Sequence, residues 1–129
     1  DLSSVSDAMF YTGAIITLNQ GDFAITLPTA TSTAEANQLL GWHARFAINN
    51  AGTGSDNITI VRGDTGNDLI IGRVASAAAD ANLAAGITVG SNVITFVDNV
   101  AVAGDFVDVI CVLATASVTK FFVSGLAST

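Results

Sequence analysis

The chain has 129 residues, half of them hydrophobic, and eleven Asp and Glu against four Lys and Arg give it a net charge of −7. This length fits one domain with a real core, and no apolar stretch approaches the ~20 residues of a membrane-spanning helix. The acidic balance disfavours nucleic acid and anionic membranes, because both attract clustered Lys and Arg. We therefore expect one domain that binds neither nucleic acid nor membrane.

Charged residues make up only 12% of the chain, which is about half the usual share. A small domain normally needs surface charge to stay dispersed, so we expect partners to cover much of this surface. A surface on which Ser, Thr and Asn replace charge is the alternative. The first residues lack the basic start and apolar stretch of a signal peptide. A processed N-terminus stays an open alternative, because the chain starts with Asp1 rather than Met.

Alternating apolar and polar residues predict β-strands in the first half of the chain. We expect a weak strand over 13–18 and a stronger one over 23–27. Pro28 ends the second strand, because proline cannot donate a hydrogen bond to a neighbouring strand. The clearest alternation covers 42–49. Since a glycine-rich loop and another alternating segment follow it, residues 42–62 are expected to form a hairpin.

Two segments depart from this alternation. Ser32 and Glu35 have the spacing of a capping box at a helix start, and Gly41 fits a helix end. A short helix is therefore expected over 33–40. The alanine-rich segment 75–85 is interpreted either as a second helix or as an ordered loop lying against a neighbouring subunit.

The second half of the chain predicts further strands at 69–71, 92–97, 105–114 and 118–124. The strand at 105–114 is apolar on both faces, interrupted only by Asp108. Such a strand lies centrally between two layers or is covered by another subunit.

These elements predict a mainly β protein: a single β-sandwich or jelly-roll-like domain with one short helix near 33–40. Residues 1–21 are expected to form an N-terminal arm and first strand, and 22–129 the sandwich itself. Because no shift in composition divides the chain, we expect one domain overall.

The residue types that carry catalysis are scarce. His43 is the single histidine, and the alternation places it on the strand face opposite Trp42, as an outward or interface residue. Cys111 is the single cysteine, in an apolar strand typical of an inert core residue. A structural zinc site uses four His or Cys ligands, and a general base needs an orienting acid. We expect no catalytic residue, no cofactor and no metal.

One turn offers an alternative to that expectation. Asp64, Asn67 and Asp68 could supply oxygen ligands to calcium, in a Gly-x-x-Gly-Asn-Asp sequence similar to one repeat of a calcium-binding β-roll. Such rolls bind the metal between tandem repeats, and the chain contains one copy. Gly, Asn and Asp are also the residues that a tight turn requires. A plain turn is therefore the expected structure, and a calcium site is the alternative.

Several segments together resemble a known module. They are "DFAITLP" at 22–28, "FAINN" at 46–50, "NITI" at 57–60, "DTGNDLIIG" at 64–72 and "KFFVSG" at 120–125. Their order is similar to a module of tailed-phage virion proteins, which occurs in capsid decoration (cement) proteins and in domains of tail fibres and spikes.

The resemblance implies a β-sandwich that works by assembly and brings no catalytic residues. For a decoration protein it implies a homotrimer on the outside of the phage head, assembled in the bacterial cytoplasm, which binds the major capsid protein and ties capsomers together. Residues 75–104 depart from the pattern and leave the place in the particle open. A receptor- or glycan-binding tail-fibre or spike module is the alternative, for which Trp42 and Tyr11 would be the aromatic platform.

Five residues are candidates for contacts between subunits. Phe10 and Tyr11 lie in the N-terminal arm, and Phe121 and Phe122 face opposite sides of one strand. Asp108 lies among apolar residues, where an unpaired charge is costly. We expect it to pair with an Arg or Lys of the same chain or with a donor across a subunit boundary. Exposure at a sheet edge is the alternative.

Overall fold

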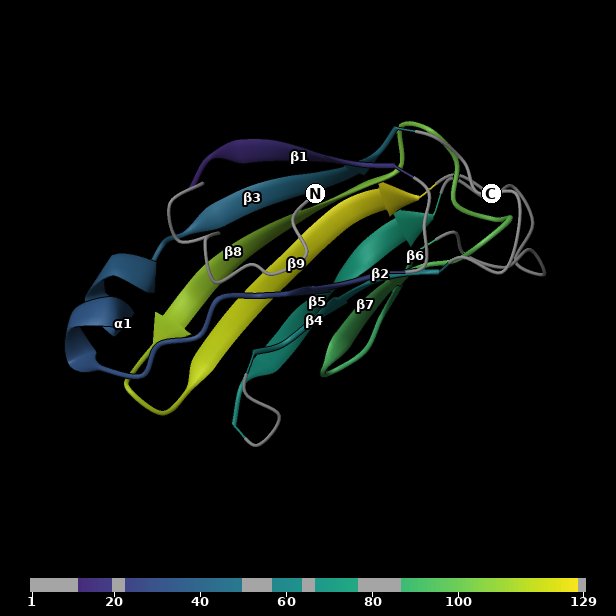
Figure 1. Ribbon diagram of the computed structural model, residues 1–129. Coiled ribbons are helices and arrows are strands. Elements are labelled where there is room, and N and C mark those ends of the chain that lie inside the picture. The colour runs from purple at the N-terminus through teal and green to yellow at the C-terminus, as the bar shows by residue number, and fades with distance from the viewer. Residues whose placement is uncertain (1–11, 20–22, 50–56, 64–66, 77–86, 128–129) are drawn as a thin grey trace.

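The computed structural model consists of two stacked β-sheets with a helix at one end (Figure 1). The residues that it describes are 12–19, 23–49, 57–63, 67–76 and 87–127. The elements are β1 (Ala14–Leu18), β2 (Phe23–Thr26), α1 (Thr33–Leu39), β3 (His43–Ile48), β4 (Ile58–Val61), β5 (Leu69–Ser76), β6 (Ile87–Val89), β7 (Val93–Phe96), β8 (Phe106–Ala114) and β9 (Thr119–Ala127). The expected mainly β sandwich with one short helix is confirmed.

The strand order shows how the chain builds the two layers. One sheet has the order β1-β3-β8-β9-β5 and the other the order β2-β4-β7-β6. From β1 to β5 each strand lies in the sheet opposite to that of the preceding strand. Two successive crossings restore the strand direction, so β1 is parallel to β3, and β2 to β4. β5 and β9 are also parallel. The described sheets are therefore mixed, whereas jelly rolls are antiparallel.

This topology corrects the hairpin expected over 42–62. β3 and β4 lie in different sheets and do not pair: β3 lies between β1 and β8, and β4 lies between β2 and β7. Alternation shows which side chains share a face, but it does not show which strand lies alongside.

Hairpins do form in the second half of the chain. β6 and β7 pair directly, as do β8 and β9. The Thr115 hydroxyl helps to close the second turn by accepting hydrogen bonds from the backbone N–H groups of Ser117 and Val118. The three-residue strand β6 was not expected. β5 extends to Ser76 and so includes the first two residues of the alanine-rich segment 75–85, which was interpreted as a helix or an ordered loop. Residues 77–85 of that segment lie outside the described residues.

Helix α1 forms where the capping signal predicted it. The Ser32 hydroxyl accepts a hydrogen bond from the Glu35 backbone N–H at 3.2 Å. The Glu35 carboxylate accepts from the backbone N–H of Thr31, one residue before the position that the capping box predicts, and this bond lowers the pKa of Glu35. Gly41 adopts a φ of 82° after the helix, a conformation that favours glycine. Its N–H donates to the Cys111 carbonyl and so attaches the helix end to β8.

The hydrophobic core lies between the two sheets. Trp42 and Phe121 meet there edge to face, with ring centroids 6.0 Å apart. Phe46 of β3 is fully buried in the same cluster. β1 is an edge strand of the five-stranded sheet. The strand expected within the N-terminal segment 1–21 is therefore an integral part of the sandwich.

Candidate interaction surface

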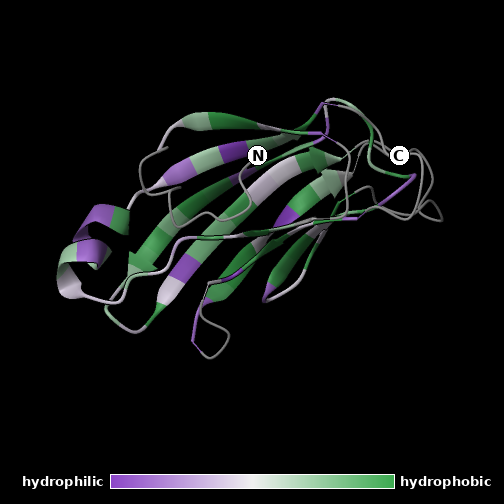
Figure 2. Ribbon diagram, viewed as in Figure 1, coloured by the Kyte–Doolittle hydropathy of each residue, from purple (hydrophilic) through white to green (hydrophobic). Residues whose placement is uncertain are grey.

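The five-stranded sheet has a second apolar face, which points away from the four-stranded sheet and which we call the outer face. Figure 2 shows β8, its central strand, as hydrophobic along most of its length. Large apolar side chains of the outer face are between 39% and 71% exposed: Ile15, Ile71, Ile110, Val112, Leu113, Phe122 and Leu126. Apolar side chains gathered on one exposed face mark a contact site more often than single exposed residues do.

A β-bulge adds to the apolar character of the outer face. The pairing of β8 with β9 shifts register between Cys111 and Leu113. Because a bulge inserts one extra residue, the consecutive residues Val112 and Leu113 are both exposed, instead of one pointing into the core.

The strand register arranges the outer face in rows that cross the sheet. One row is His43, Ile110, Phe122 and Ile71. The next is Ile15, Arg45, Asp108, Ser124 and Arg73. The third is Thr17, Ala47, Phe106, Leu126 and Ala75. A row of polar and charged groups therefore lies between two largely apolar rows.

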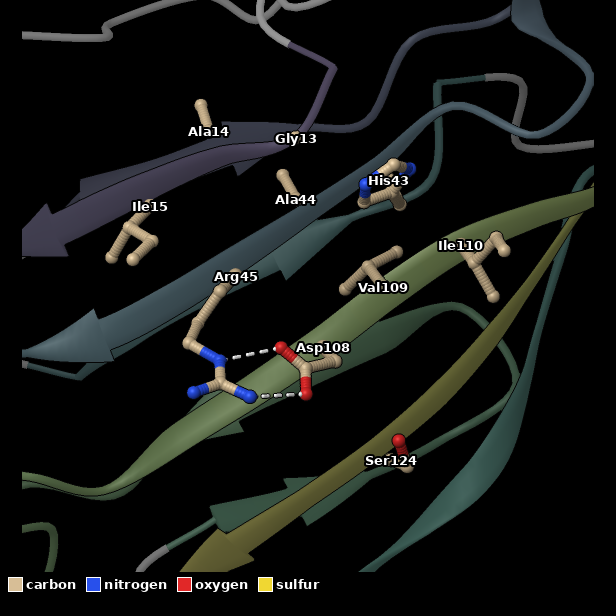
Figure 3. A pocket seen from close by; sticks show the side chains of 10 residues that line it. All are labelled: Gly13, Ala14, Ile15, His43, Ala44, Arg45, Asp108, Val109, Ile110 and Ser124. Atoms are coloured by element: carbon tan, nitrogen blue, oxygen red, sulfur yellow. Dashed lines mark hydrogen bonds and ion pairs between the residues drawn. The ribbon is translucent and has the colours of Figure 1, made fainter.

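An ion pair occupies the centre of the polar row (Figure 3). The Arg45 guanidinium donates two hydrogen bonds to the Asp108 carboxylate, at 2.7 and 2.8 Å, and lies over the Phe106 ring at 4.1 Å. The hydrogen bond to Asp108 raises the pKa of Arg45. The expectation that Asp108 pairs with a basic residue of the same chain is confirmed. The alternative of a sheet edge is wrong, because β8 is the central strand.

A shallow hollow of about 310 Å³ lies over the ion pair, with Ile15, His43, Ile110 and Ser124 also in its lining (Figure 3). His43 is exposed on the side of β3 opposite the buried Trp42, as expected. Its Nδ1 atom is 3.2 Å from the Gly41 carbonyl oxygen. Both Asp108 oxygens are held by Arg45, so this carboxylate is not placed to orient the imidazole. The hollow therefore presents a concave surface and an ion pair to a contacting molecule.

The other interface candidates fall in different places. Phe122 lies on the outer face, 47% exposed. The prediction that Phe121 contacts another subunit is wrong, because its side chain is fully buried in the core of this chain. Phe10 and Tyr11 lie outside the described residues.

In the turn considered for calcium, the buried carboxylate accepts a hydrogen bond from the backbone. Asp68 is fully buried, and its Oδ1 accepts a hydrogen bond from the Thr119 backbone N–H at 2.7 Å. Its backbone carbonyl accepts from Arg62. Asn67 is exposed, and Asp64 lies outside the described residues. Within the described ranges, no three His, Cys, Asp or Glu side chains are grouped to hold a metal ion. Asp68 therefore connects the start of β5 to the start of β9.

Cys111 lies on the inner face of β8 and is 1% exposed. Burial raises the pKa of its thiol to about 11. The nucleophilic form of cysteine is the thiolate, so this residue is a neutral thiol near pH 7. Its position agrees with the core role expected from the sequence.

Sequence reasoning missed most of the outer face. Ile15, Ile71, Ile110 and Leu126 were not among the interface candidates, although the first three lie in the two rows that contain Phe122 and Asp108, and Leu126 lies in the adjacent third row. A signal was present: strands apolar on both faces, as at 105–114. What was lacking was the register that brings such residues together.

Comparison with known proteins finds no matching family model, no matching curated protein and no matching solved structure. Among the described helices, none has the length and hydrophobicity needed to cross a bilayer. The resemblance to a phage module therefore stays a prediction from the sequence motifs.

Proposed function

We propose that the protein is a structural virion subunit of a tailed phage, a decoration protein that self-associates and binds the outside of the head. There it would contact the major capsid protein and stabilise the junctions between capsomers. The observation that carries the proposal is the apolar outer face of the five-stranded sheet. The sequence motifs supply the phage particle as its setting.

The outer face is not needed to complete the core. The inner face of the same sheet already packs on the four-stranded sheet, with Phe46, Val109 and Phe121 at most 1% exposed. Exposed Phe122, Ile110 and Val112 therefore represent apolar area that folding leaves in water. Covering such area is worth about 25 cal/mol per Å², from which the cost of association must be subtracted. A protein that works by adding contacts between subunits uses this kind of surface.

The tail-fibre or spike alternative loses its main support. A glycan platform needs exposed aromatic side chains, and Trp42 is 2% exposed in the core. Tyr11, the other candidate, lies outside the described residues. Among the large apolar residues exposed in the described ranges, Phe122 is the aromatic one, and its neighbours Ile110 and Ile71 are aliphatic. This setting suits protein contact better than sugar stacking.

The proposal is tested by mixing the purified protein with expanded, undecorated capsids of the same phage and imaging them by cryo-electron microscopy. Added density at three-fold or quasi-three-fold positions is the expected result. Capsids without added density at any site would contradict the proposal.

A matched pair of variants then tests the surface. Phe122→Ser removes an apolar side chain from the outer face, and Leu40→Ser removes one that is 56% exposed just after α1. We expect the first variant to reduce occupancy on the capsid and the second to leave it unchanged.

A further inference from the structure

We propose that the outer face of the five-stranded sheet binds an extended segment of a different protein, in which two carboxylates flank an apolar side chain. The carboxylates would pair with Arg73 and Lys120, and the apolar side chain would cover Phe122. This inference rests on the proposed function, because it gives the partner chemistry of the same surface.

Two cations of the outer face are left without a carboxylate in the described part of the chain. Arg73 is exposed and Lys120 is half-buried, and neither makes an ion pair with another described residue. Among the described strand residues, Asp108 is the single acid of the outer face. Arg45 already holds both of its oxygens. A carboxylate for either cation must therefore come from outside these strands.

The register of β9 with β5 places Phe122 between the two cations. Lys120 precedes Phe122 by two residues on β9, and Arg73 lies beside Ser124, two residues after Phe122. Since a strand rises by about 3.3 Å per residue, the backbone positions of the cations are roughly 13 Å apart along the strands. The neighbours of Phe122 on β5 and β8 are both isoleucines. An apolar patch therefore lies between two positive charges.

A strand laid on this face matches that spacing. Strands of stacked sheets run within about 30° of each other, and every second side chain of a strand points to the same face. An acid, an apolar residue and a second acid at alternate positions would also span roughly 13 Å. The expected partner is therefore an extended segment with the pattern acid-x-apolar-x-acid. Complementary charges around an apolar contact fix the orientation of docking.

The 129 residues of this chain do not contain such a segment. Asp64 and Asp68 are the one pair of acids four residues apart in the sequence, and Gly66 rather than an apolar side chain lies midway between them. Asp68 is moreover fully buried in the core. The segment that fits the outer face therefore belongs to a different protein rather than to a second copy of this sequence.

The test is an NMR titration of the isotope-labelled, full-length protein with two synthetic peptides, both capped at their ends. Thr-Glu-Thr-Leu-Thr-Glu-Thr has the proposed pattern, and Glu-Glu-Thr-Leu-Thr-Thr-Thr has the same composition with its carboxylates side by side. We expect the first peptide to shift backbone signals of β5, β8 and β9, and the second to bind about threefold more weakly or less. Added salt should weaken binding of the first peptide, because the charge pairs are exposed.

Variants of the protein assign the contacts. Arg73→Gln and Lys120→Gln should each weaken binding of the first peptide about threefold, and Phe122→Ser should weaken it without changing its salt dependence. Two control variants away from the outer face should bind like the wild type. Gln38→Glu, at an exposed position of α1, lowers the net charge as much as Arg73→Gln, and Leu40→Ser removes an exposed apolar side chain. The amide spectrum of each variant verifies that it is folded.

Three results would overturn the inference: no shift changes at millimolar peptide, equal affinity for the two peptides, or equal losses in the control variants. Shift changes at the outer face on concentrating the protein alone would assign this face to a second copy and would overturn it as well.

Capsid binding, measured separately, distinguishes this failure from that of the proposed function. Full capsid occupancy by the double variant Arg73→Gln, Lys120→Gln, without peptide binding by the wild type, refutes the partner chemistry and leaves decoration standing. Peptide binding as expected, with capsids that remain bare, refutes decoration and leaves the partner chemistry standing.

Discussion

Phe121 and Phe122 are neighbours on β9, yet one is fully buried and the other is 47% exposed. They represent the two faces of the five-stranded sheet. The inner face packs on the four-stranded sheet around Trp42 and Phe46, whereas the outer face surrounds the Arg45–Asp108 ion pair. A sheet that is apolar on both sides therefore uses one side to fold and offers the other for contact. Four experiments, taken from the largest expected effect to the smallest, test this division.

The two phenylalanines should differ most in stability. Phe121→Ala leaves a cavity beside Trp42 and should lower the free energy of unfolding by about 3–5 kcal/mol. Phe122→Ala removes a side chain that is already half in water and should cost far less, within about 1 kcal/mol. Urea unfolding at low protein concentration measures both without a contribution from association. Similar losses for the two variants would contradict the division into faces.

Two carboxylates provide the next comparison. Asp68→Ala leaves the buried Thr119 N–H without its acceptor and should cost about 1–3 kcal/mol. Asp68→Asn keeps a side-chain oxygen and should cost less. Asp108→Ala, on the outer face, should change stability much less, because water reaches both partners of its ion pair. The midpoints of urea unfolding measure these differences. If Asp108→Ala lost as much stability as Asp68→Ala, the assignment of Asp108 to a water-exposed outer face would be refuted.

The buried thiol of Cys111, on the inner face, predicts that the free energy of unfolding depends on pH. The pKa of Cys111 is raised from 9.0 to about 11 in the folded protein by burial. Its contribution to stability is therefore complete below pH 9 and is lost as the pH rises towards 11, because the unfolded chain releases the proton first. The difference in unfolding free energy between wild type and Cys111→Ala should narrow over this range. A difference independent of pH would show that the thiol is not buried.

The smallest effect is expected from the ion pair of the outer face. A double-mutant cycle with Arg45→Ala and Asp108→Ala measures the coupling between the two side chains. In the free protein it should be weak and fall further as salt is added, because both side chains are over 40% exposed. Strong, salt-independent coupling would mean that the pair is already shielded from water.

Local sequence patterns predicted the elements well, because local physics determines them. Alternation located β3 and β8, and the Ser32 cap with Gly41 located α1. The pairing of strands was not predictable in the same way. β3 and β4 alternate as hairpin strands do but lie in different sheets, and their neighbours β1 and β2 run parallel to them. No residue pattern within β3 or β4 indicates that the chain crosses from one sheet to the other between them.

The candidate surface was partly predictable for a related reason. The two apolar sides of 105–114 indicated a covered strand, and the apolar surroundings of Asp108 indicated a cationic partner. The partner itself, Arg45, lies 63 residues away, so only the register of β3 with β8 brings the two together. Phe121 and Phe122 were expected to face opposite ways. Because both are phenylalanine, their sequence gave no sign of which one points into the core.

The most direct test of the central claim is a cryo-electron microscopy map of the assembled protein on its capsid, at a resolution that shows side chains. We expect another protein chain to cover Phe122, Ile110 and Ile71. An assembled particle in which the outer face of the five-stranded sheet remains open to solvent would contradict it.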